Sequence, residues 1–195
     1  ANLGYAEGRW LRPVWPGDTL RAESTVIGLK ENSNGKSGNV YVRTVGLNQH
    51  DEPVLDYVRW VMVRKNRLDA PTPAPQVPEL QKTVAANDLV IPQGLDFSNY
   101  DFGLAGEPHR WGDYAIGEKI DHVDGVTIEE AEHMLATRLW QNTAKVHFDR
   151  SQREDGRRLI YGGHVISLAR SLSFSGLANA QMIVALNGGA HANPC

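Results

Sequence analysis

The chain has 195 residues, of which 41% are hydrophobic and 22% are charged, an ordinary balance for a soluble globular protein. Its 20 basic and 23 acidic residues give a net charge of -3, which provides no large positive field, so we expect neither nucleic acid nor a membrane as a partner. No stretch approaches the roughly 18 apolar residues of a membrane span, and the first residues do not show the basic region and apolar segment typical of a signal peptide, so we expect a cytoplasmic location.

Residues 1–65 have the period of β-strands. A strand is expected over the first ten residues, a second where Leu20, Ala22, Ser24 and Val26 alternate with polar neighbours, and a third in the β-branched run at 39–47. Asn34-Gly35 predicts a type I′ hairpin turn, because both residues tolerate a positive φ. A fourth strand is expected over 54–64, and its nearly continuous apolar content predicts burial on both faces.

Residues 66–108 break every regular pattern. Five prolines interrupt the segment, at Pro71, Pro73, Pro75, Pro78 and Pro92. The sequence therefore predicts a linker that joins two similar domains.

Regular patterns return after Trp111. Residues 118–128 are expected to form a strand and a turn, and Thr127 with Glu130 has the spacing of a capping box. A helix should then run to Trp140, with one apolar face made of Ile128, Ala131, Leu135 and Leu139.

A second helix is expected to open at Gly162-Gly163, with an apolar stripe that should lie buried in a curved sheet. The stripe consists of Val165, Leu168, Ala169 and Leu172. Residues 180–194 should form the next strand. Because the chain begins without Met inside a strand and stops without a turn signal, we expect it to be a fragment.

His147 lies in a polar turn between the two predicted helices. An imidazole with a pKa of about 6.5 can take and return a proton at neutral pH. The amide of Gly163 should lie at the positive end of the second helix, where it can stabilise an enolate-like oxyanion. The only cysteine, Cys195, is the last residue, so a cysteine nucleophile is not expected. The pattern suits acyl-thioester chemistry.

Three long segments, RPVWPGDTL at 12–20, 117–149 and 157–180, resemble the mesaconyl-CoA (2-methylfumaryl-CoA) hydratases, or β-methylmalyl-CoA dehydratases, of the MaoC-like hotdog proteins. The resemblance implies an α+β chain, a partial double hotdog in which antiparallel sheets wrap a long helix. Residues 1–65 would then be the C-terminal strands of the first hotdog, 66–108 the linker, and 109–195 the N-terminal, catalytic part of the second hotdog.

The resemblance also implies roles for single residues. His147 takes the place of the family histidine, and Gly163 that of the glycine whose amide binds the thioester oxygen. Asn142 stands where the family has Asp, and since an amide cannot accept a proton near neutral pH, it would orient water. His147 would then carry most of the proton transfer, or Asp149 would assist it.

The activity implied is reversible syn hydration of an α,β-unsaturated acyl-CoA, with mesaconyl-CoA as the substrate. Gly162 and His164 are expected beside the substrate together with Gly163. No cofactor and no metal are expected, and a homodimer fits the exposed sheet edges of a fragment.

Other interpretations of the same residues stay open. Asn142 could cap the first helix, Asp149 could form a turn, and His164 could be a packed neighbour. Among functions, a hotdog thioesterase would use the same helix-end amide, and a truncated hotdog could act only as a pairing module. His147 and Asp149 with His164 or His133 could also imitate a two-histidine, one-carboxylate iron site.

Overall fold

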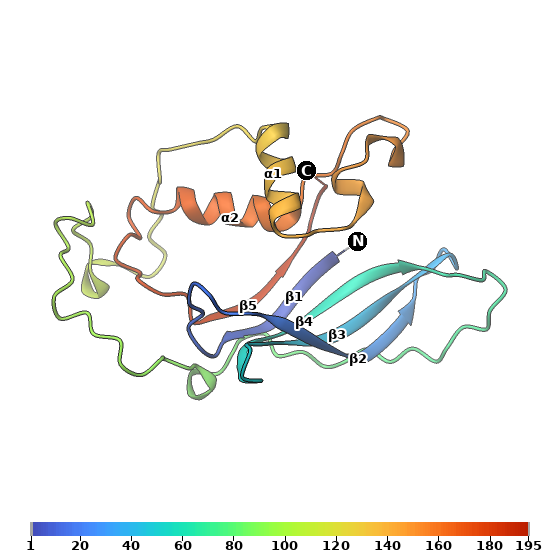
Figure 1. The fold of residues 1–195 in the computed structure, drawn as a ribbon, viewed down its shortest axis with the longest axis horizontal. Coiled ribbons are helices and arrows are strands. Elements are labelled where there is room, and N and C mark those ends of the chain that lie inside the picture. The colour runs from blue at the N-terminus through green and yellow to red at the C-terminus, as the bar shows by residue number, and fades with distance from the viewer. Residues whose placement is uncertain (1, 195) are drawn as a thin grey trace. The chain divides into compact units, whose positions relative to one another are not determined.

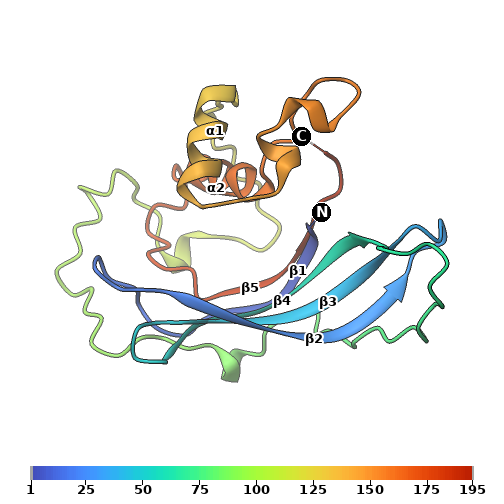
Figure 2. The same cartoon turned by 45° about the vertical axis from the view of Figure 1, so that its right-hand side comes forward.

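The computed structural model describes residues 2–194 and contains one antiparallel sheet and two α-helices (Figure 1). The strands are β1 (Asn2–Trp10), β2 (Arg21–Glu31), β3 (Ser37–Leu47), β4 (Pro53–Arg64) and β5 (Ala185–Ala190). They lie in the order β2-β3-β4-β1-β5, which Figure 2 shows as a twisted sheet. The helices are α1 (Glu130–Leu139) and α2 (Gly162–Leu172). No helix among the described residues is long and apolar enough to cross a membrane.

The four strands expected in residues 1–65 are confirmed, but the turn between β2 and β3 is not of type I′. Pairing continues to Glu31 and Gly38, and the amide of Asn32 donates to the carbonyl of Ser37, so the connection covers 33–36. Gly35 has a φ of 64°, whereas Asn34 is not among the residues with positive φ. A type I′ turn needs a positive φ at both of its central residues. This four-residue connection has a positive φ at Gly35 alone.

Strand β4 is buried on one face only, which corrects the expectation of burial on both. Val54, Asp56 and Val58 are buried, while Tyr57 is half-buried and Met62 is 41% exposed. This period of two places the alternate residues of β4 in the same core, which also contains Ala6, Val42 and Leu47.

A charged group lies within this core. The Asp56 carboxylate accepts hydrogen bonds from Arg9 and Arg43 at 2.7–2.9 Å. Burial raises the pKa of Asp56, but the hydrogen bonds and charges of Arg43 and Arg9 outweigh it and leave that pKa below its usual range. These hydrogen bonds join β4 to β1 through Arg9 and to β3 through Arg43.

The predicted strand near the C-terminus is confirmed as β5, which pairs antiparallel with β1 and completes the sheet. The chain divides into two compact units. The sheet unit runs to Asp96 and includes Met182–His191, and the helical unit contains Phe97–Gln181. Residues 66–108 contain neither an α-helix nor a strand, only the 3-10 turn Ala86–Asp88 and a bridge from Gln76 to Leu29.

The start of α1 differs from the prediction. Residues 118–128 form no strand, and Val123, with a φ of 64°, breaks the extended run. The helix begins at Glu130 behind Glu129, with no side-chain cap, so the capping box at Thr127 is wrong. That box would need Thr127 directly at the helix start, and the helix opens three residues later.

The inward face of α1 is polar. Leu135 and Leu139 of the predicted apolar face are 69% and 67% exposed, whereas His133 and Thr137 are fully buried. The Thr137 hydroxyl donates to the carbonyl of His133 at 2.8 Å, so the buried hydroxyl is satisfied within the helix. In α2, which begins at Gly162 as predicted, only His164 is fully buried. The apolar stripe is buried in part: Val165, Leu168 and Leu172 are half-buried and Ala169 is exposed.

Candidate active site

The ring of His147 is held by the segment that leads into α2. His147 ends the 3-10 turn Lys145–His147, and its Nδ1 donates to the carbonyl of Leu159 at 2.9 Å. The amide of Leu159 in turn donates to the carbonyl of Val146 at 2.9 Å. Because a carbonyl only accepts, Nδ1 carries the proton, and Nε2 of the neutral ring keeps a free lone pair. The local fold therefore presents Nε2 as a base.

Tyr161 links His147 to the start of α2. The ring centroids of His147 and Tyr161 are 5.8 Å apart. Tyr161 is the N-cap residue of α2, and its carbonyl accepts hydrogen bonds from the amides of His164 and Val165. A β-carbon placed on Gly163 would lie 2.6 Å from the Tyr161 hydroxyl, so the phenol rests directly on this glycine. The structure thus brings His147 and the turn that carries Gly163 into one neighbourhood.

The Gly163 amide lies in the first turn of α2. The first amides of a helix have no partner within the helix and point toward its positive end. Within the described chain, no backbone hydrogen bond is formed by the amides of Gly162 and Gly163. They are therefore available to an anionic oxygen.

His133 lies beneath these groups. Its side chain is 0% exposed, and its Nε2 accepts a hydrogen bond from the Tyr161 amide at 2.9 Å. Its ring centroid lies 6.3 Å from that of His147 and 6.1 Å from that of His164. Burial lowers the pKa of His133 below its ordinary value, as do the nearby His147, His164 and Arg158. His133 is therefore neutral at neutral pH.

His164 is a buried residue of α2. Its Nε2 lies 3.8 Å from the Glu132 carboxylate and has no hydrogen-bond partner among the residues described. Its ring lies next to that of His133, which agrees with the interpretation of His164 as a packed neighbour. Its predicted contact with substrate stays a prediction.

Asn142 and Asp149 make local contacts. The Asn142 side-chain oxygen accepts from the Ala144 amide at 3.1 Å, in the turn that follows α1. The Asp149 carboxylate accepts from the Ser151 hydroxyl and amide and from Gln152, which lowers the pKa of Asp149. Within residues 2–194, neither side chain is hydrogen-bonded to His147.

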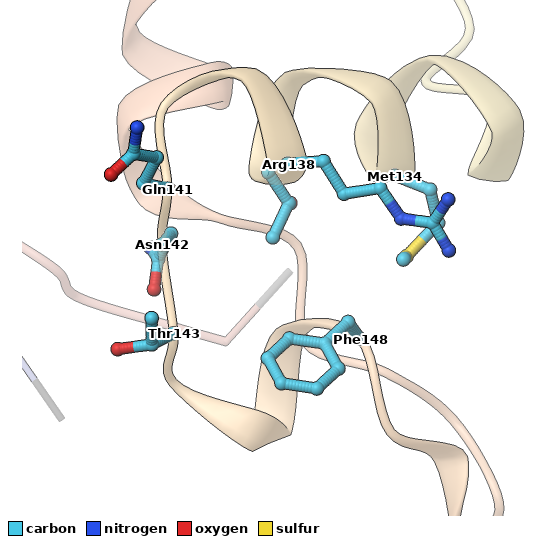
Figure 3. A pocket seen from close by; sticks show the side chains of 7 residues that line it. Met134, Arg138, Gln141, Asn142, Thr143 and Phe148 are labelled. Carbon is cyan, nitrogen blue, oxygen red and sulfur yellow. The ribbon is translucent and has the colours of Figure 1, made fainter.

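A cavity of about 440 Å³ opens between α1 and the following turn (Figure 3). Asn142 lines it, but His147 and Gly163 do not. The lining residues are Met134, Thr137, Arg138, Gln141, Asn142, Thr143 and Phe148.

The described part of the chain contains no group of three or more His, Cys, Asp or Glu side chains that could hold a metal ion. The iron-site interpretation needs His147 and Asp149 to converge, and their hydrogen bonds go to different partners.

The rings of His133, His147, Tyr161 and His164 form a cluster. Two of these residues were not identified as site residues from the sequence. His133 figured only in the iron-site interpretation, and Tyr161 was not singled out. The available signals were the His133/Thr137 pair at helical spacing and an aromatic residue directly before Gly162-Gly163.

Two curated proteins are similar to this chain over its whole length. It is 82% identical over 195 residues to a protein from Cereibacter sphaeroides named mesaconyl-CoA hydratase, covering 100% of this chain and 57% of the relative. It is 60% identical over 197 residues to the β-methylmalyl-CoA dehydratase of Chloroflexus aurantiacus, covering 100% of this chain and 56% of that protein. The chain therefore spans little more than half the length of these relatives.

Solved structures agree on the fold. A MaoC domain dehydratase from Chloroflexus aurantiacus superposes with a TM-score of 0.95 at 58% identity, covering 100% of this chain and 56% of that one. A Mycobacterium tuberculosis protein described as a double hotdog gives a TM-score of 0.63 at 24% identity over 100% of this chain and 59% of its own. No family model matches the chain. The expected α+β class and partial double-hotdog fold are confirmed.

Proposed function

We propose that this chain belongs to the MaoC-like double-hotdog family and carries the reacting groups of a hydro-lyase acting on an α,β-unsaturated acyl-CoA. The names of its relatives support mesaconyl-CoA as the unsaturated thioester and β-methylmalyl-CoA as its hydrate. The geometric observation that carries the proposal is a histidine with a free Nε2 beside the helix end that contains Gly163.

In the proposed reaction, His147 Nε2 accepts a proton from water as the water oxygen bonds to the β-carbon. The electrons of the carbon–carbon double bond move toward the thioester oxygen, which becomes enolate-like against the Gly163 amide. The same proton then passes from His147 to the α-carbon on the same face, which gives syn addition. General acid–base help of this kind contributes about 10²–10⁴-fold, and one oxyanion donor about 2.7–4 kcal/mol.

The remaining expected residues take supporting roles in this proposal. The Asn142 side-chain oxygen is occupied by Ala144, which leaves its NH₂ group to orient water. Gly162 provides a second backbone amide for the oxyanion at the start of α2, and His164 is the buried residue of the same helix turn. Asp149 caps the following 3-10 turn, Arg150–Gln152, through its contacts with Ser151 and Gln152, and thereby holds the chain directly after His147.

A turnover screen of the full-length protein tests the proposal. Crotonyl-, fumaryl- and mesaconyl-CoA are supplied in turn, and loss of the conjugated thioester is followed together with release of free CoA thiol. We expect hydration of mesaconyl-CoA in preference to the other two, without thiol release. Thiol release would instead identify a thioesterase, and a protein inert toward all three would act as a pairing module.

We also propose that the protein works as a homodimer. Hotdog sheets end in exposed strand edges, which a second copy can cover. Size-exclusion chromatography with light scattering would give twice the chain mass, whereas a monomer at micromolar concentration would contradict it. The cytoplasmic location stays a prediction.

A further inference from the structure

We infer that His133 is a positioning residue, which fixes the helix-end oxyanion site by accepting the backbone N–H of Tyr161. The inference rests on the proposed function, since it assigns how the same site is held in place. Its basis is one hydrogen bond between residues 28 positions apart, from the Tyr161 amide to His133 Nε2 at 2.9 Å.

The bond sits where it controls the start of α2. The Tyr161 N–H is tied to His133, and the Tyr161 carbonyl accepts the first amides of the helix, from His164 and Val165. The two peptide groups on either side of the Tyr161 α-carbon are thereby fixed, two residues before Gly163. The Tyr161 ring, which rests on Gly163 and lies beside His147, follows the same backbone. A shift at Tyr161 would therefore move the amide and the ring together.

The bond also requires one protonation state of His133. Nε2 can accept only through its lone pair, so the neutral ring carries its proton on Nδ1, a buried atom without a partner in residues 2–194. The charged or titratable groups around the ring are His147 from the turn, His164 from α2, Arg158 from the segment before α2, and Glu130 from α1. Only Glu130 favours the charged ring, and it is paired with Arg158.

Two substitutions separate an acceptor role from a proton-transfer role. His133→Gln places an amide oxygen near the position of Nε2 and does not titrate, whereas His133→Leu has a similar volume and no acceptor. In the full-length protein we expect His133→Leu to lower kcat for mesaconyl-CoA at least about tenfold with little change in KM, because oxyanion contacts strengthen mainly in the transition state. We expect His133→Gln to stay within about threefold of wild type.

A spectroscopic measurement tests the bond without relying on activity. In ¹⁵N-labelled wild-type protein, an N–H···N bond should give scalar coupling between the Tyr161 amide nitrogen and His133 Nε2. The coupling should disappear below the pH at which His133 is protonated. Its absence at neutral pH would overturn the inference even if the protein hydrates mesaconyl-CoA. Its presence in a protein without turnover would uphold the part of the inference in which His133 fixes the start of α2, and would count against the proposed function.

The kinetic outcomes are equally decisive. A folded His133→Leu protein with wild-type kcat would show that the bond does not position the site. A His133→Gln protein as slow as His133→Leu would show that the imidazole itself is needed, which also contradicts a positioning role. If His133→Leu fails to fold, the comparison of His133→Gln with wild type and the coupling measurement still decide.

Discussion

Replacing His147 by Asn removes the proposed base while keeping the contact that orients it. The Asn side-chain nitrogen is attached to Cγ as Nδ1 is in His, so it can still donate to the Leu159 carbonyl. What disappears is Nε2. Loss of general acid–base catalysis of about 10²–10⁴-fold corresponds to about 3–5 kcal/mol in the activation barrier. We therefore expect kcat/KM for mesaconyl-CoA to fall by that factor, in a steady-state assay of the full-length protein.

Stability should change far less. Even complete loss of the hydrogen bond to Leu159 would cost only about 0.5–1.5 kcal/mol in the free energy of unfolding. The matched control is His50→Asn, at an exposed histidine in the turn between β3 and β4, which should leave both quantities unchanged. A folded His147→Asn protein that keeps more than about a third of the wild-type kcat/KM would refute the assignment of His147 as the base.

Three further predictions follow from the same contacts. Gly163→Ala would bring a β-carbon within 2.6 Å of the Tyr161 ring, so we expect displacement of the ring and a loss in kcat of about ten- to hundredfold, and a smaller loss in a Tyr161→Ala background. Asn142→Asp keeps the side-chain acceptor of the turn, so urea unfolding should give a free energy within about 0.5 kcal/mol of wild type. It also replaces the NH₂ group proposed to orient water by an oxygen that cannot donate, so kcat should fall by about tenfold. Asp56→Asn weakens three charged hydrogen bonds and should cost about 1.5–3 kcal/mol at pH 7. Because the pKa of Asp56 is lowered on folding, this difference should persist above pH 4 and shrink as the pH falls through the folded-state pKa.

A specific result would contradict each of these three predictions. For the glycine, Gly112→Ala is the control, since no atom lies within 4 Å of an added β-carbon there, and equal kinetics of the two alanine variants would contradict the close contact. For Asn142, a wild-type kcat in a protein of unchanged stability would show that its NH₂ group does not orient water. For Asp56, a stability difference that grows below pH 4 would show that the carboxylate is destabilising.

The strands and the second helix could be predicted because their signals are local. Alternation in β2 and β3 depends on neighbouring residues, and Gly162-Gly163 marks the opening of α2 by its own backbone freedom. The start and orientation of α1 could not be predicted in this way. Its apolar face, with Leu135 and Leu139, was chosen by periodicity, yet the face turned inward is the one with His133.

The sequence by itself determined the α+β class, the strand pattern, the resemblance to the hydratases, and the choice of His147 and Gly163 as candidates for proton transfer and oxyanion binding. Only the tertiary structure decided that Tyr161 and His133 join these candidates. The reason is that the contact between His133 and Tyr161 spans 28 residues and depends on how α1 packs against the segment before α2. This part-buried hydrogen bond favours that packing over the apolar alternative, because an unpaired backbone N–H away from water costs about 1–3 kcal/mol. Local periodicity carries no information about such a bond.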